Sequence, residues 1–140
     1  MSLKCYVESI IQRPPFRYID ECLHIDRCAR SAHFVLDAGR NANRFGDSAG
    51  LQGFLLVEAM AQASGVLLRT LTHGDPGGYL IGLENARLPA LGPTTRLVID
   101  AVMTMVCPPL FTFQVHIHDD AACIAESQIQ IMSKRELNAA

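Results

Sequence analysis

No pair of cysteines in this sequence has the Cys-x-x-Cys spacing that zinc ribbons and redox motifs require. The five cysteines are an odd number and lie far apart, so the simplest expectation is reduced thiols in a cytoplasmic protein. They are Cys5, Cys22, Cys28, Cys107 and Cys123. No cluster of histidine, cysteine and aspartate has the spacing of a metal site either, so we expect no metal ion and no other cofactor.

The sequence also lacks a large excess of charge of one sign and a long, purely apolar run. The formal net charge is −2, so no basic field indicates nucleic acid as a partner. The N-terminus carries one lysine but no long apolar region, which gives no sign of a signal peptide. The most apolar stretch contains Gln52, Glu58, Gln62 and Arg69 and is therefore too polar to span a bilayer. We expect no membrane segment.

That stretch, Leu51–Leu71, contains no proline, and apolar residues occupy nearly every side of it. A helix that is apolar all round is a buried helix. Glu58 and Gln62 are four residues apart and share one face of it. A carboxylate in such a helix either fixes packing through a hydrogen bond, or it is a site residue whose pKa the apolar surroundings raise. The sequence alone leaves both interpretations open.

The rest of the chain reads as strands and turns within a single domain, 1–140, in which 1–12 is an N-terminal arm or short helix and 133–140 a frayed tail. Alternation of apolar and polar residues predicts six strands. They are Phe16–Arg27, Ser31–Asp37, Tyr79–Arg87, Thr95–Cys107, Leu110–His118 and Ala122–Met132. Runs of strands around one helix indicate an α+β fold with an antiparallel sheet. Because one sheet covers only one side of a helix, we also expect a dimer.

This layout resembles the hotdog-fold 3-hydroxyacyl-acyl-carrier-protein dehydratases of fatty-acid synthesis. The specific part is Glu-Ala-Met-Ala-Gln-Ala at 58–63, with Gly53 and Phe54 ahead of it. Weaker matches lie at 13–20, 79–87 and 91–97, so the resemblance covers about Arg13 to Met132. It is also similar to a diverged, dehydratase-like branch found with aryl polyene gene sets, whose members work beside a fuller sibling.

The resemblance implies a His–Glu pair in which the histidine removes a proton from C2 of the acyl chain and the helix carboxylic acid protonates the departing 3-hydroxyl. Glu58 matches the acid. Gly53 and Phe54 match the place at the helix start where backbone amides meet the thioester oxygen. Gln62, on the face of Glu58, is counted with them as substrate-binding. The substrate implied is a thioester of acyl carrier protein or coenzyme A.

The histidine of the family falls on Arg44, and no histidine occurs anywhere in Ala38–Gly50. Arginine stays protonated and cannot act as the base. Arg44 is instead expected either to have no fixed role or to bind substrate by holding a carrier's phosphate or acidic surface. Of the histidines, His33 is the one before the helix that could approach a pocket. His24, His116 and His118 are expected to be solvated on polar strand faces, and His73 to lie at the helix end.

Three functions remain open at this stage. The first is a dehydratase-like protein on 3-hydroxyacyl thioesters, weak alone, acting as a homodimer or as a heterodimer with a sibling. The second is a hotdog thioesterase that uses Glu58 to attack the thioester or activate water. The third is a non-catalytic acyl-binding subunit that keeps the fold without the base.

Overall fold

The computed structural model describes residues 18–37, 49–72, 78–87, 96–120 and 122–133, and within these it leaves the side chains of 49–54 and 78–79 undescribed. The predicted arm, Arg44 and the loop around it lie outside this part. One helix and six strands follow one another along the chain. They are β1 (Glu21–Asp26), β2 (Ser31–Asp37), α3 (Ala49–Leu71), β3 (Gly78–Arg87), β4 (Arg96–Cys107), β5 (Leu110–His118) and β6 (Cys123–Ser133).

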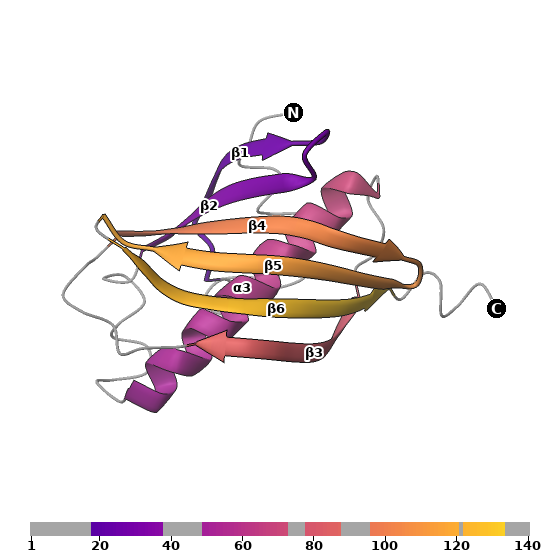
Figure 1. The fold of residues 1–140 in the computed structure, drawn as a ribbon. Coiled ribbons are helices and arrows are strands. Elements are labelled where there is room, and N and C mark those ends of the chain that lie inside the picture. Colours follow the sequence, from indigo (N-terminus) through magenta and orange to yellow (C-terminus); the bar gives the residue numbers. More distant parts are fainter. Residues whose placement is uncertain (1–17, 38–48, 73–77, 88–95, 121, 134–140) are drawn as a thin grey trace.

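The six strands form one antiparallel sheet in the order β1-β2-β4-β5-β6-β3, and α3 crosses one face of it (Figure 1). β1 and β3 are the two edges. This confirms the predicted α+β architecture of about six strands around one helix. We call the face that packs on α3 the inner face and the opposite one the outer face.

Alternation along the strands places apolar side chains on the inner face. One cross-strand row illustrates it: Phe34, Ile99, Ile117 and Ala125 are register partners on successive strands, and all are buried. Leu56, Met60 and Leu67 of α3 are fully buried in the same cluster. At the other end of the helix, the Arg27 guanidinium donates to the carbonyl of Thr70 at 2.9 Å, which satisfies a carbonyl in the last turn. The helix is thus held against the rest of the domain from Leu56 to Thr70.

The first predicted strand was wrong in its bounds and its faces. Phe16–Arg27 was expected to be one strand with Tyr18, Asp20, Cys22 and His24 on a polar face. The strand begins only at Glu21, and Cys22 is a core residue at 1% exposure. The register shifts between Cys22 and His24, so the alternation breaks there. Burial raises the pKa of the Cys22 thiol to about 11, so this thiol stays protonated and inert.

Smaller corrections concern the start of the helix, the end of β6 and one face of β4. The helix begins at Ala49, two residues inside the predicted loop. Ser133, expected in the frayed tail, is the buried last residue of β6 and donates its amide to the Pro109 carbonyl at 2.8 Å. Alternation along β4 would place Met105 on the inner face with Ala101 and Met103, but it is 44% exposed because the register shifts between Met103 and Met105. β2 and β5 have the predicted bounds.

Candidate functional site

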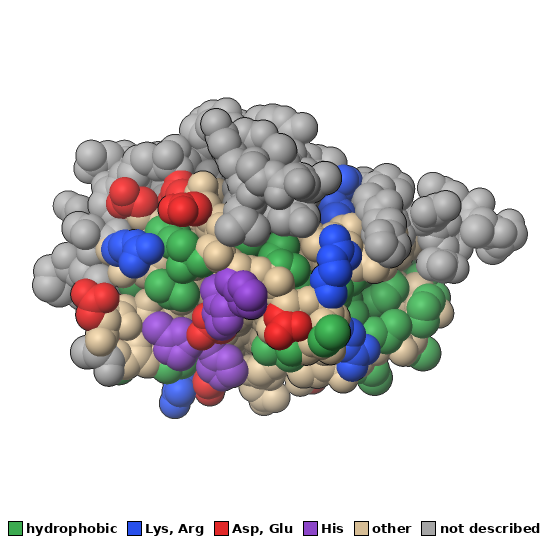
Figure 2. Space-filling view, turned by 90° about the horizontal axis from the view of Figure 1, so that it is seen from above, with side chains coloured by type: hydrophobic (Ala, Val, Ile, Leu, Met, Phe, Trp, Pro, Cys, Tyr) green, Lys and Arg blue, Asp and Glu red, His purple; other side chains and the backbone are tan. Residues whose placement is uncertain are grey.

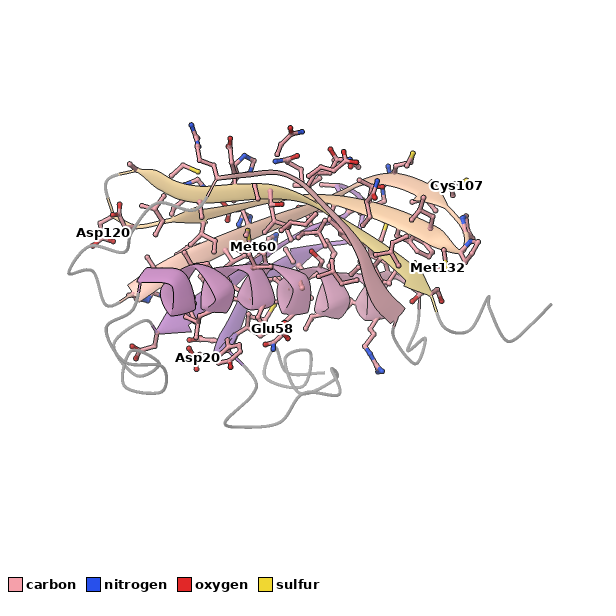
Figure 3. All side chains as sticks on the ribbon, turned by 90° about the horizontal axis from the view of Figure 1, so that it is seen from below. Asp20, Glu58, Met60, Cys107, Asp120 and Met132 are labelled. Atoms are coloured by element: carbon pink, nitrogen blue, oxygen red, sulfur yellow. The ribbon has the colours of Figure 1, made fainter. Side chains whose placement is uncertain are left out.

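Glu58 lies on the side of α3 that turns away from the sheet. Its side chain is half-buried, whereas Met60, two residues further on, is fully buried. Figure 3 shows Met60 between the helix and the sheet, with Glu58 and Asp20 on the opposite side of the helix. Among the described residues, none encloses this carboxylate on the side away from the sheet, so it can meet a ligand or a second chain.

Gln62 holds the Glu58 carboxyl in place. The Gln62 side chain is 3% exposed, and its Nε2 donates to Glu58 Oε1 at 3.1 Å. Its Oε1 accepts the backbone N–H of Tyr18 at 2.8 Å. The predicted sharing of one face by Glu58 and Gln62 is therefore confirmed as a direct hydrogen bond. The contact with Tyr18, 44 residues away, adds an anchor that sequence reasoning did not find.

The uncovered side of α3 forms a stripe. Glu58, Ala61, Gly65 and Arg69 recur at intervals of three or four residues and are all half-buried, while the residues facing the sheet are buried. Residues so spaced share one helix face. The described part of the chain therefore covers the helix on one side only. This uncovered side is the reason for which we expected a dimer.

The structure describes the other predicted site residues only in part or not at all. Gly53 lies in α3, and Phe54 follows it, but their side chains are not described. Because the helix begins at Ala49, Gly53 is its fifth residue, whereas the amides that a helix start leaves free belong to its first four. The contact of Gly53 and Phe54 with a thioester oxygen thus requires the first turn to open, and it stays a prediction. Arg44 lies outside the described residues.

A second polar cluster, which the sequence did not predict, crosses the outer face of the sheet. One side chain from each strand lies in a single register row. The row comprises His24, His33, Asp100, His116, Glu126 and Arg87. Figure 2 shows histidine side chains gathered with carboxylates on one side of the molecule. We call this set, together with His118, the outer-face row.

Ion pairs and ring contacts connect the outer-face row. Asp100 binds His33 through Oδ1 and His118 Nε2 through Oδ2, the latter at 2.8 Å. The rings of His116 and His118 stack with centroids 6.1 Å apart, as do those of His24 and His33. His116 Nε2 and Arg87 each reach Glu126, at 3.5 and 3.3 Å.

These contacts change two expectations about histidines. His116 and His118 are paired rather than simply solvated. His33 points to the outer face, since its neighbours Ala32 and Phe34 are buried on the inner one, so it does not share the side of the molecule where Glu58 lies.

Two further observations concern metal ions and membranes. Among the described residues, no group of three or more histidine, cysteine, aspartate or glutamate side chains is placed to bind a metal ion. Within the same part of the chain, no helix has the length and hydropathy needed to cross a membrane.

Six antiparallel strands around one helix, with a carboxylate on that helix, define a hotdog-fold protein of the kind found among dehydratases and thioesterases. A family model for ApeP-like proteins, described as ApeP dehydratase, matches residues 6–140. The chain belongs to this family of dehydratases.

Individual proteins agree with this assignment. The chain is 24% identical over 136 residues to the 3-hydroxyacyl-[acyl-carrier-protein] dehydratase FabZ of Paracidovorax citrulli (strain AAC00-1), covering 90% of this chain and 93% of that protein. A chain of the dehydratase heterocomplex ApeI:P from Xenorhabdus doucetiae has the same fold, with a TM-score of 0.75, 19% identity and 95% of each chain covered. Zebra fish thioesterase superfamily member 2 shares it with a TM-score of 0.72 and 15% identity, over 95% of this chain and 99% of that one.

Proposed function

We propose that this protein is a dehydratase subunit that acts on 3-hydroxyacyl thioesters of an acyl carrier protein in the cytoplasm, in fatty-acid or polyene biosynthesis. The observation that carries the proposal is Glu58, a half-buried carboxylate on the uncovered side of the central helix, oriented by Gln62. The family assignment and the FabZ relative support the reaction class and the carrier.

In this function Glu58 is the acid. It gives a proton to the 3-hydroxyl as the C3–O bond breaks, and water leaves. A base takes the C2 proton, and the developing negative charge on the thioester oxygen is stabilised by amides at the start of α3. Gln62 keeps the carboxyl aimed, because one of its oxygens is held at 3.1 Å from Nε2.

The base has to come from elsewhere. All four histidines among the described residues lie on the outer face, away from α3, and the family position of the base is Arg44. A second chain that places its own histidine against the uncovered stripe of α3 completes the site. The ApeI:P heterocomplex shows that proteins of this fold occur as mixed dehydratase complexes, which supports a sibling as the partner.

The edge strand β3 offers a surface for that second chain. Leu80, Ile81 and Leu83 are large apolar residues with 40 to 48% of their surface exposed. An exposed apolar edge strand is an open position for another strand. We therefore propose that two chains, alike or different, pair along β3 and bring the uncovered sides of their helices together.

The test mixes this protein with a sibling dehydratase that keeps its loop histidine but has lost its own helix acid. Hydration of a crotonyl thioester, the reverse reaction, is measured by loss of enoyl absorbance. We expect each protein alone to be at least about 10²-fold slower than the mixture, because each lacks one member of the acid–base pair. The mixture with Glu58→Ala should stay as slow as the separate proteins, and Asp120→Ala, a change at an exposed carboxylate, serves as the control.

Other outcomes identify the competing functions. Free acid and thiol as products, formed in a Glu58-dependent way, indicate the thioesterase. Binding of acyl thioesters without turnover in any mixture indicates an acyl-binding subunit. Ordinary dehydratase rates from this protein alone contradict the shared site, because they require a base within the same chain.

A further inference from the structure

Gly82 leaves an open place on the edge strand, and a side chain of the next strand fills it. Gly82 lies on β3 and is the register partner of Gln130 on β6. A Cβ atom added to this glycine would overlap Oε1 of Gln130 and would lie 3.1 and 3.2 Å from Cδ and Cβ of the same side chain. The backbone of Gly82 is not in the left-handed region, so its conformation does not demand glycine. The missing side chain matters because it makes room for the Gln130 amide.

The Gln130 amide stands where a side chain of β3 would face a neighbouring strand. Adjacent strands are about 4.8 Å apart, so an amide that lies over Gly82 is displaced by one strand spacing toward the open edge. Opposite residues of an antiparallel pair have Cβ atoms about 4.5–5.5 Å apart. A strand added along β3 therefore places the residue that faces Gly82 within hydrogen-bond reach of the amide. Among the described residues, none forms a hydrogen bond with this amide, so its donors and its acceptor are available.

The two faces of β3 limit how a second β3 pairs with it. Leu80 and Leu83 lie on the inner face, because each is the register partner of a buried isoleucine of β6. Gly82 and Glu84 lie on the outer face, opposite glutamines of β6 that alternate with those isoleucines. The register shifts at Ile81, between the two faces. Because opposite residues of an antiparallel pair share a face, the two leucines of one chain must meet leucines of the other.

Two identical β3 strands satisfy this condition in only a few antiparallel alignments. In these alignments the residue of the other chain that faces Gly82 is Ile81, Gly78 or Glu84. Ile81 and Gly78 have no polar side chain, so the glutamine amide would lose water without gaining a hydrogen bond. Glu84 faces Gly82 when Leu83 faces its own counterpart. The carboxylate of Glu84 then lies beside the amide and supplies the missing acceptor.

We infer that the Gln130 amide donates to Glu84 of a second copy of this chain, across the junction of two β3 strands, and that the bare Gly82 makes this contact possible. This inference rests on the pairing along β3 in the proposed function, and it adds a register and a residue of β6 to that interface. The bond from Nε2 to a carboxylate is charge-assisted. Because a dimer of identical chains is twofold symmetric, each dimer contains the contact twice.

Dissociation constants of the dimer, measured by sedimentation velocity over a dilution series, test the contact. We expect Gln130→Ala and Glu84→Ala each to weaken the dimer by at least about tenfold, because each dimer loses two charge-assisted bonds. The double variant should be weaker than either single variant by less than about twofold, because both changes remove the same bond. Gln114→Ala is the matched control. Gln114 is a half-buried glutamine of β5, on the same face and two strands away from the edge, so its loss should leave the dissociation constant unchanged.

Gly82→Ala tests the place in which the amide lies. The first atom that the introduced Cβ displaces is the end of a flexible side chain, so the fold should tolerate the change, which thermal unfolding checks. We expect Gly82→Ala to weaken the dimer about as much as Gln130→Ala, and to add nothing when the two are combined. Equal dissociation constants for Gln130→Ala and Gln114→Ala overturn the inference, and so do fully additive losses in the variant that combines Gln130→Ala with Glu84→Ala.

The outcomes for this contact and for the proposed function are distinguishable. A parent protein that stays monomeric at micromolar concentration contradicts the pairing along β3, and the contact falls with it. A dimeric parent whose dissociation constant does not depend on Gln130 or Glu84 leaves the pairing in place and removes the contact alone. Turnover that depends on Glu58 in the mixture with the sibling tests the catalytic role separately from either result.

Discussion

At the scale of single residues, Thr112 is the clearest misfit in the described structure. It is 2% exposed, and its hydroxyl finds no hydrogen-bond partner, although its carbonyl accepts from Thr104 Oγ1 at 3.3 Å. A buried hydroxyl without a partner costs roughly 1–3 kcal/mol. The side chain is β-branched and sits in a strand, so valine can take its place without a change of shape.

Thr112→Val should therefore raise the free energy of unfolding by about 1 kcal/mol. Urea titration followed by circular dichroism measures the change. Thr104→Val is the control, because Thr104 is an exposed residue whose hydroxyl has a partner, so its removal should give no gain. Equal stabilisation by both substitutions would show that β-propensity, and not the buried hydroxyl, is responsible.

At the scale of the elements, Asp100 connects three neighbouring strands. It lies on β4 and binds His33 of β2 on one side and His118 of β5 on the other. These side chains are between 30% and 43% exposed, so solvent weakens the pairs. Removing one carboxylate still breaks two contacts in different strand pairs, and the effect on the sheet should exceed that of an ordinary surface charge.

We expect Asp100→Ala to lower the free energy of unfolding by about 1 kcal/mol. In a double-mutant cycle with His118→Gln, the coupling should be about 0.5 kcal/mol. Asp120→Ala, at an exposed position outside the strands, gives the baseline for losing a carboxylate. Strict additivity of Asp100→Ala and His118→Gln contradicts a direct role for the pair in stability.

The elements also show what the sequence could predict. Strict alternation over Leu110–His118 fixed the bounds and faces of β5, because the pattern is local. The prediction of β1 was wrong because the buried Cys22 lies on what the alternation indicates as a polar face. The register shift between Cys22 and His24 also has no signal in the local sequence. The outer-face row could not be predicted, because the pairing of His33 with Asp100 depends on strand order across 67 residues.

Part of the candidate site could likewise be predicted from the sequence, and part could not. Glu58 stands out in the sequence as a carboxylate within an apolar helix, and Gln62 follows from helical spacing. The bond from the Tyr18 amide leaves no trace in side-chain patterns, because a backbone group supplies the donor. A contact of that kind appears only when the fold brings residue 18 to the helix.

At the scale of the whole molecule, the exposed edge of β3 predicts association. We expect light scattering at micromolar concentration to give about twice the 15.3 kDa mass of the chain. Ile81→Lys should shift the mass toward the monomer, because a lysine on an edge strand opposes pairing with another strand. Ile81 is 48% exposed, so the substitution leaves the core of the monomer intact.

Met105→Lys is the matched control for association. Met105 is a similarly exposed apolar residue, at 44%, but it lies toward the far end of β4 and away from the β3 edge. The Met105→Lys variant should remain a dimer. A monomeric parent protein, or equal loss of association in both variants, contradicts pairing along β3.

The strand order has a consequence for how the chain is made. β3 follows the helix directly in sequence, but its neighbour in the sheet is β6. Met132, the register partner of Tyr79, is therefore synthesised much later than Tyr79 itself. Ribosomes deliver the N-terminal part first, and contacts between distant residues form slowly. Until the last strand emerges, Leu80, Ile81 and Leu83 belong to a strand without a partner. The nascent chain therefore carries an unpaired, apolar strand through about a third of its own synthesis.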